Sequence, residues 1–74
     1  MSQFAVESEV QGNVWQLLVS VGDQVSEGDT LVILESMMVE IPVEAPVPGR
    51  VTEVLVAPED AVAEEQGLVV IEQS

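Results

Sequence analysis

One internal repeat constrains the fold of this chain more than any other feature. Residues 12–35 align with residues 49–72 without a gap, at a constant offset of 37, and ten of the 24 positions are identical. Two copies are too few for a solenoid, which needs about three or more repeats to cover its ends. If each copy forms short strands with one apolar face, the two faces can bury each other. The repeat therefore predicts a closed pair with approximate two-fold symmetry.

The residues of the repeat favour β-strands. Valine and isoleucine dominate it, and the longest apolar runs, such as 31–34 and 68–71, are short and separated by Gly, Pro, Asp and Ser. No segment shows the periodicity of an amphipathic helix. We expect an all-β fold for residues 1–74 as a single domain. It should be a flattened antiparallel β-barrel or sandwich of about eight short strands with quasi-two-fold symmetry.

Glycine positions indicate where the chain turns. Turns are predicted at residues 22–23, 27–29 and 48–49, where glycine can supply a positive φ without steric cost. In the second copy Gly22 is replaced by Glu59, and Gly28 is replaced by Glu65. If both copies keep the same backbone, these glutamates hold a strained conformation; otherwise Gly67 shifts the turn.

The charge balance excludes several classes of function. Fourteen acidic residues stand against one basic residue, Arg50, for a formal net charge of −13, and the chain contains no lysine. Such a field repels nucleic acid and anionic membranes, so positively charged protein surfaces are the expected partners. Without histidine or cysteine, zinc sites, thiolate nucleophiles and the usual general bases are absent. We expect a non-catalytic domain.

The chain is also expected to be cytoplasmic. Its apolar runs are far shorter than the ~20 residues that span a membrane. The first ten residues, MSQFAVESEV, have neither a basic start nor a long apolar core, so they do not match a secretory signal.

The segment that links the two copies predicts a hairpin. Met37 and Met38 follow a strand that ends at Glu35, and residues 39–43 alternate apolar and polar side chains as a new strand would. The hairpin should cover residues 35–41 with the two methionines at its tip. Pro42 must then lie at an edge or where no ladder hydrogen bond is needed.

The sequence resembles the biotinyl/lipoyl attachment domain family, and within it the biotin carboxyl carrier domains. The resemblance rests on V-x-V-G-D-x-V-x-E-G-D-x-L-V-x-L-E-S-M at residues 19–37, on E-I-P-V-x-A-P-V-x-G-x-V at residues 40–51, and on the repeat. It implies the barrel-sandwich hybrid fold of that family, whose biotinylated lysine lies within Glu-Ala/Ser-Met-Lys-Met. The corresponding attachment-turn residues here are Glu35, Ser36, Met37, Met38 and Val39.

The resemblance implies a carrier domain of a biotin-dependent carboxylase, for example of the acetyl-CoA carboxylase type used in fatty acid biosynthesis. Its partners would be a biotin ligase and the carboxylase and carboxyltransferase subunits. Met38, however, stands at the acceptor-lysine position. A thioether cannot form the amide, and no other lysine exists in the chain. We therefore expect no cofactor on this sequence, although biotin is the cofactor of the family.

Two alternatives remain open at the level of sequence. One is a non-enzymatic protein-interaction module on the same fold, and the other is a lipoyl-type carrier, whose turn usually reads Asp-Lys-Ala. No metal site is expected, because the methionine pair lacks further ligands and the acidic pairs 59–60 and 64–65 are better explained as solvated charge. Glu35 and Glu40 are expected to be exposed at the strand ends. Trp15 should cover the edge of the core.

Salt should stabilise this acidic domain. With fourteen acids and one arginine on a small surface, like charges lie within a Debye length of about 10 Å at 0.1 M salt. Screening should therefore relieve repulsion that opposes the compact state. Thermal unfolding followed at low and at molar KCl should show a rising midpoint. A midpoint that stays level or falls would contradict this expectation.

Overall fold

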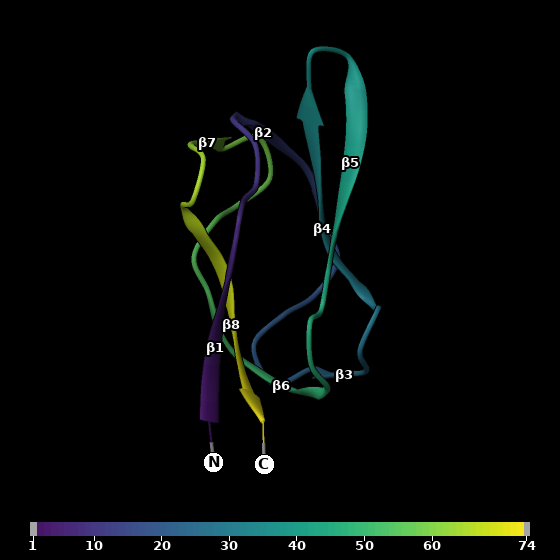
Figure 1. Ribbon diagram of the computed structural model, residues 1–74, viewed down its shortest axis with the longest axis vertical. Helices are drawn as coiled ribbons and strands as arrows, with labels where there is room; N and C mark the ends of the chain where they lie inside the picture. Colours follow the sequence, from purple (N-terminus) through teal and green to yellow (C-terminus); the bar gives the residue numbers. More distant parts are fainter. Residues whose placement is uncertain (1, 74) are drawn as a thin grey trace.

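Residues 2–73, which the computed structural model describes, form two four-stranded antiparallel sheets (Figure 1). The first sheet has the strand order β1-β8-β6-β3, and the second has the order β5-β4-β2-β7. The predicted all-β sandwich is confirmed. The strands are β1 (Ser2–Glu7), β2 (Gly12–Leu17), β3 (Gln24–Val25), β4 (Thr30–Ser36), β5 (Val39–Glu44), β6 (Gly49–Val54), β7 (Ala61–Val62) and β8 (Gly67–Gln73).

The structural repeat is longer than the sequence repeat. Every strand of the first half has an equivalent 37 residues later, and this includes β1, whose equivalent is β5. The two halves are therefore residues 2–36 and 39–73. Sequence comparison missed the first strand of each half, because only three of ten positions in residues 2–11 are identical to residues 39–48.

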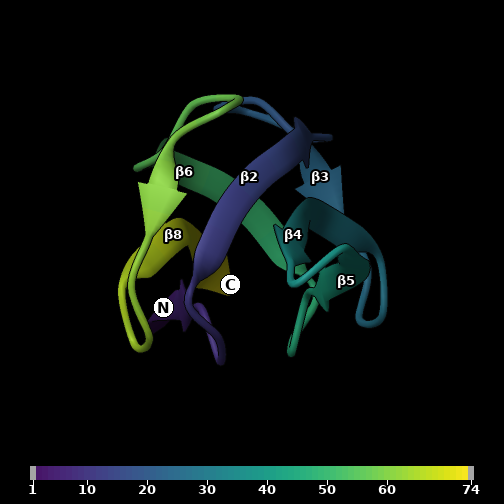
Figure 2. The same ribbon diagram turned by 90° about the horizontal axis from the view of Figure 1, so that it is seen from above.

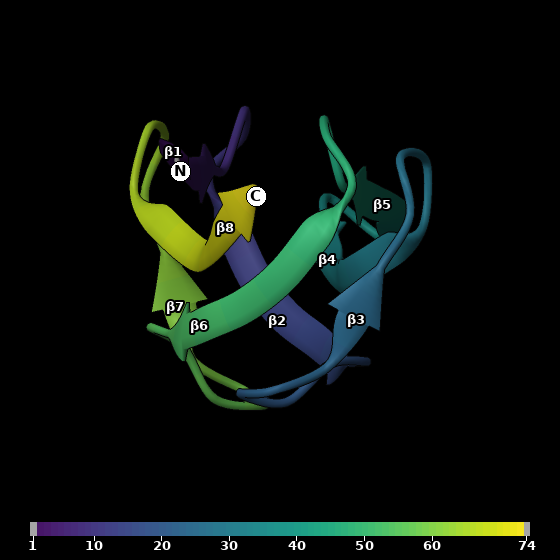
Figure 3. The ribbon, with the colours of Figure 1, turned by 90° about the horizontal axis from the view of Figure 1, so that it is seen from below.

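Each sheet combines strands from both halves. The central strands β8 and β6 belong to the second half, and their outer neighbours β1 and β3 belong to the first; the other sheet has the reverse composition. Both Figure 2 and Figure 3 show the central strands β2 and β6 crossing each other. Loop hydrogen bonds join the halves too. The N–H of Val51 donates to the carbonyl oxygen of Asp23 at 2.9 Å, and the carbonyl oxygen of Val51 accepts from the N–H of Gly22 at 2.8 Å. Equivalent bonds join the other loop to β2.

The core is as symmetric as the strands. It lies between the two sheets, and Leu31, Leu34, Leu68 and Ile71 are its largest fully buried side chains. Six pairs of equivalent residues supply most of it: Val14/Val51, Val19/Val56, Val25/Val62, Leu31/Leu68, Val32/Val69 and Leu34/Ile71. Most of the apolar residues that are identical or similar in the repeat thus belong to the core, whereas the identical pair Leu18/Leu55 is exposed.

Gly12 and Gly49 begin the equivalent strands β2 and β6. Positive φ at Gly49 is not observed, so that part of the turn prediction is wrong. A Cβ at residue 49 would overlap the carbonyl oxygen of Glu72 and would lie 2.8 Å from Ile71 Cγ2. Close backbone approach, rather than conformational freedom, requires glycine here.

Trp15 contributes less to the core than we expected. It lies at a β-bulge, because the pairing of β2 with β4 shifts register between Val14 and Gln16. The extra residue of a bulge is left out of the ladder. Trp15 keeps 45% of its surface exposed and is therefore a surface residue, useful as a fluorescent reporter of unfolding.

The turns before β7 and β8 keep the backbone of the first half without its glycines. Gly22 and Gly28 have φ of 98° and 90°, and the equivalent Glu59 and Glu65 have φ of 74° and 69°. Gly67 starts β8 and does not shift the turn. Of the two alternatives left open by the sequence, the strained glutamates are correct.

Replacing both glutamates by glycine should stabilise the protein. A non-glycine residue in the left-handed conformation costs about 1–2 kcal/mol, and glycine removes this strain. Glycine is also more flexible in the unfolded chain, which reduces the gain in stability by about 0.5–1 kcal/mol at each position. Glu59→Gly with Glu65→Gly should therefore raise the free energy of unfolding by about 1–2 kcal/mol in total, measured by urea titration of Trp15 fluorescence. Glu59→Gln with Glu65→Gln is the control for lost charge. Equal gains in both variants would show that backbone strain is not the cause.

Candidate functional site

The β4–β5 hairpin ends in a two-residue turn of unusual composition. Ser36 pairs with Val39, so Met37 and Met38 form the loop, and the predicted hairpin with methionines at its tip is confirmed. Their φ values are 52° and 67°. Two positive φ values in a two-residue hairpin identify a type I′ turn, which strongly prefers Asn-Gly. Methionine at both positions therefore leaves the turn strained by a few kcal/mol at most.

The tip of this hairpin is apolar and exposed. Met37 and Met38 are 93% and 94% exposed, and Val39 is 58% exposed. The domain is 36 Å long and 17 Å wide. Figure 1 shows the hairpin tip at one end of the long axis and both chain ends at the other. Residue 38 is thus held far from the points where the domain could be joined to other chain segments.

The base of the hairpin is tied to the body of the domain. The Ser36 hydroxyl donates to the backbone carbonyl of Gln11, in the loop between β1 and β2, at 2.9 Å. Glu35 and Glu40 face each other across the strands, and both are exposed, as expected. Sequence reasoning missed Gln11, and no sequence signal identifies it, because only its backbone oxygen takes part.

A hollow of about 570 Å³ lies beside the turn. Its walls come from the loop that holds Gln11, from the end of β4 up to Met37, and from β7. All five residues expected at the attachment turn, Glu35 to Val39, lie at the end of β4, in the turn and at the start of β5, at one end of the molecule. Their role in cofactor attachment stays a prediction.

The other features considered from the sequence are metal sites, the acidic pairs and membrane spans. In the part of the chain that the structure describes, no three His, Cys, Asp or Glu side chains are grouped so that they could hold a metal ion. The acidic pairs 59–60 and 64–65 are exposed. Residues 2–73 contain no helix that is long and apolar enough to cross a membrane.

Comparison with known proteins shows the family of this chain. The family model described as "Biotin-requiring enzyme", the biotin/lipoyl family, matches residues 3–71. The chain belongs to the biotin/lipoyl attachment family. The resemblance inferred from the sequence motifs is confirmed, and the two-sheet fold with the hairpin at one pole is the fold of this family.

Curated relatives match one half of the chain. The biotinylated protein TB7.3 homolog of Mycolicibacterium smegmatis is 54% identical over 37 residues, which are 50% of this chain and 52% of that protein. The biotin/lipoyl attachment protein of Bacillus subtilis is 46% identical over 37 residues, which are 50% of this chain and 51% of that protein. The matched segment thus spans about half the length of these relatives.

Two solved carboxylases contain a domain of the same shape. The urea carboxylase of Kluyveromyces lactis aligns with a TM-score of 0.90 and 32% identity, over 97% of this chain and 6% of that chain. A single-chain, multi-domain long-chain acyl-CoA carboxylase aligns with a TM-score of 0.91 and 28% identity, over 97% of this chain and 7% of that chain. The chain therefore has the fold of a domain that makes up a small part of such carboxylases.

The residues at the hairpin tip do not fit a covalently bound biotin. Amide attachment needs a side-chain amine at the turn, and the exposed atoms there are the thioethers of Met37 and Met38, which have no N–H. The chain contains no lysine that could replace them. The fold of the family is kept, and the turn offers no side-chain amine.

The strain in the turn can be measured. Met37→Asn with Met38→Gly supplies the residues that a type I′ turn prefers and should raise the free energy of unfolding by about 1–2 kcal/mol. For a domain of this size, each kcal/mol of added stability raises the midpoint of thermal unfolding by roughly 4–8 °C. Met37→Leu with Met38→Leu keeps the strain and should leave the midpoint unchanged. A double leucine variant as stable as the Asn-Gly variant would contradict the assignment of the turn.

Proposed function

We propose that this domain is a biotin carboxyl carrier-like module of a biotin-dependent carboxylase, of the acetyl-CoA carboxylase type, that cannot be biotinylated on its attachment turn. One observation carries the proposal. Residue 38 is 94% exposed at the tip of a tight hairpin, at the pole opposite the chain ends, and it is methionine in a chain without lysine. The position suits attachment of a cofactor, and the side chain does not.

The domain's own residues then perform recognition rather than group transfer. The hairpin holds the tip in one geometry, and Ser36 ties its base to the loop at Gln11. The expected partners are the biotin ligase, which would find no amine, and the carboxylase and carboxyltransferase subunits, which would meet a carrier without a biotin. The cytoplasmic location stays a prediction.

A second function is favoured by the surface of the tip. Met37, Met38 and Val39 form an exposed apolar knob, with the acidic Glu35 and Glu40 beside it. Such a knob suits a protein-interaction module that docks on an apolar pocket with a basic rim. This module would have kept the fold of the family without its carrier role.

Restoring the lysine should distinguish the two functions. Met38→Lys with Val39→Met recreates Glu-Ser-Met-Lys-Met from Glu35 onward. With a biotin ligase, biotin and ATP, this variant should gain one biotin, seen by intact mass and streptavidin blotting, whereas the unchanged protein should gain none. The rigid turn should supply much of the rate, because it holds the amine in one geometry. Stability should change by less than about 0.5 kcal/mol, because residue 38 is exposed.

A lysine elsewhere is the matched control. Glu59→Lys places an exposed lysine in another positive-φ turn, away from the hairpin, and should stay unmodified. A folded Met38→Lys/Val39→Met variant that the ligase ignores would reject the carrier function and favour the docking module. Biotin mapped to an internal peptide of the unchanged protein would also reject the proposal.

A further inference from the structure

A groove of about 490 Å³ lies between β1 and β5, separate from the hairpin turn. Each of these strands is an outer strand of its sheet, and residues of both line the groove. Because β1 and β5 are equivalent in the repeat, the groove lies where the two halves meet. Neither Met37 nor Met38 lines it.

The floor of the groove is apolar and incompletely covered. Val10, Ile41 and Val43 line it and are only half-buried, while Val6 and Leu34 behind them belong to the buried core. Covering this floor with a ligand would stabilise the complex by about 0.8 kcal/mol for each methylene group removed from water. An apolar concavity with few polar groups is the usual form of a binding site.

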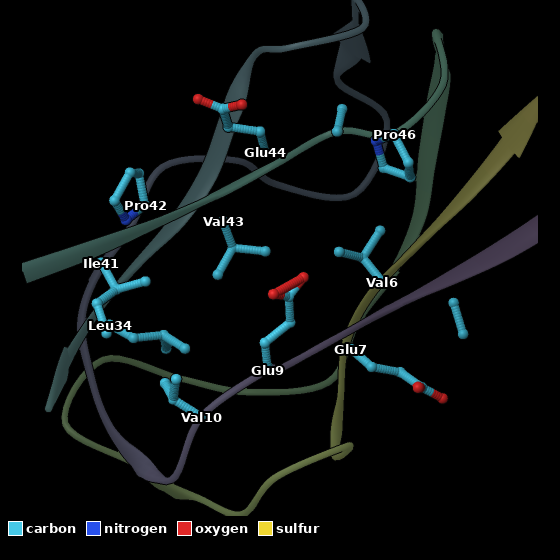
Figure 4. Close-up of a pocket in the computed structure, with 12 residues that line it drawn as sticks. Val6, Glu7, Glu9, Val10, Leu34, Ile41, Pro42, Val43, Glu44 and Pro46 are labelled. Atoms are coloured by element: carbon cyan, nitrogen blue, oxygen red, sulfur yellow. The ribbon is translucent and has the colours of Figure 1, made fainter.

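Acidic side chains surround this floor, and no basic side chain of residues 2–73 pairs with them. Glu7, Glu9 and Glu44 line the groove and are exposed. In Figure 4 the Glu9 carboxylate lies between the side chains of Val6 and Val43, whereas Glu7 and Glu44 point outward. The chain's single basic side chain, Arg50, instead pairs with Glu72 at 3.9 Å. A positively charged side chain at the groove must therefore come from a partner.

One border of the groove is open to strand pairing. β1 (Ser2–Glu7) is an outer strand that contains neither proline nor lysine, the residues that commonly protect such an edge. β5 contains Pro42, which has no N–H to donate. An extended segment can therefore form backbone hydrogen bonds with β1 more readily than with β5.

We propose that this groove binds an extended, cationic segment of a partner protein, which adds to β1 as a further strand. Alternate side chains of a strand face opposite ways, so apolar residues of the segment contact Val43 and Ile41 while lysine or arginine between them meets the glutamates. A second copy of this chain does not fit, because it would bring the same acids to the same place. The inference does not depend on residue 38 or on the proposed function.

The test uses a defined peptide and the whole 74-residue chain. The probe is an acetylated and amidated peptide of three Lys-Val repeats, titrated into ¹⁵N-labelled protein at physiological salt. Chemical shift changes should concentrate in residues 5–10 and 41–46 and should saturate. Glu9→Gln should weaken binding about threefold, whereas Glu53→Gln, which removes an equal charge from an exposed site on β6, should change it little.

Further controls separate the apolar and backbone contributions. A Lys-Ser peptide keeps the charge and should bind at least about tenfold more weakly, because the floor is left uncovered. Val43→Thr, which keeps the size of the side chain, should also weaken binding, with thermal unfolding to check the fold. A peptide with N-methylated backbone should bind more weakly still. Equal losses for Glu9→Gln and Glu53→Gln, or equal binding of the Lys-Val and Lys-Ser peptides, would overturn the proposal.

Discussion

The exchange of outer strands between the two halves is the interaction on which the rest of the structure depends. Each half contributes two central strands to one sheet and two outer strands to the other, so neither half can complete a sheet alone. The loop bonds of Val51 with Gly22 and Asp23, and their equivalents on β2, join the halves at the crossing of the central strands. A thin core of equivalent valines and leucines becomes sufficient because both sheets close on it at once.

This exchange also determines where the hairpin lies. At the turn of Met37 and Met38 the chain passes from the first half to the second, and the equivalent place in the repeat is the end of the first sheet where Ser2 of β1 pairs with Gln73 of β8. The tip and the chain ends must therefore lie at opposite poles, as Figure 1 shows. A domain joined to a larger assembly at its ends would present this tip outward, which is the placement that a carrier or a docking module needs.

Non-glycine residues with positive φ occur as two pairs, and the two pairs have different causes. Glu59 and Glu65 hold positive φ because the second half keeps the turn geometry that glycine permits in the first half. Met37 and Met38 hold it because their two-residue hairpin adopts a type I′ turn, one of the two turn types that match the right-handed twist of the strands. The first pair is a consequence of the repeat, whereas the second pair lies at the candidate site and remains exposed. Strain that is retained at an exposed tip is typical of positions under functional constraint.

The sequence by itself determined the all-β fold, the core pairs such as Val14/Val51, the hairpin tip at Met37 and Met38, and the absence of an acceptor lysine. These follow from residue identity, apolar spacing and a gapless repeat, which are local properties. Only the tertiary structure decided that β1 belongs to the repeat, that Gly49 serves close packing against Glu72, and that Glu9 lies over an apolar groove. Those features depend on which segments meet across the two sheets, and pairing between distant residues leaves no signal in the spacing of neighbouring ones.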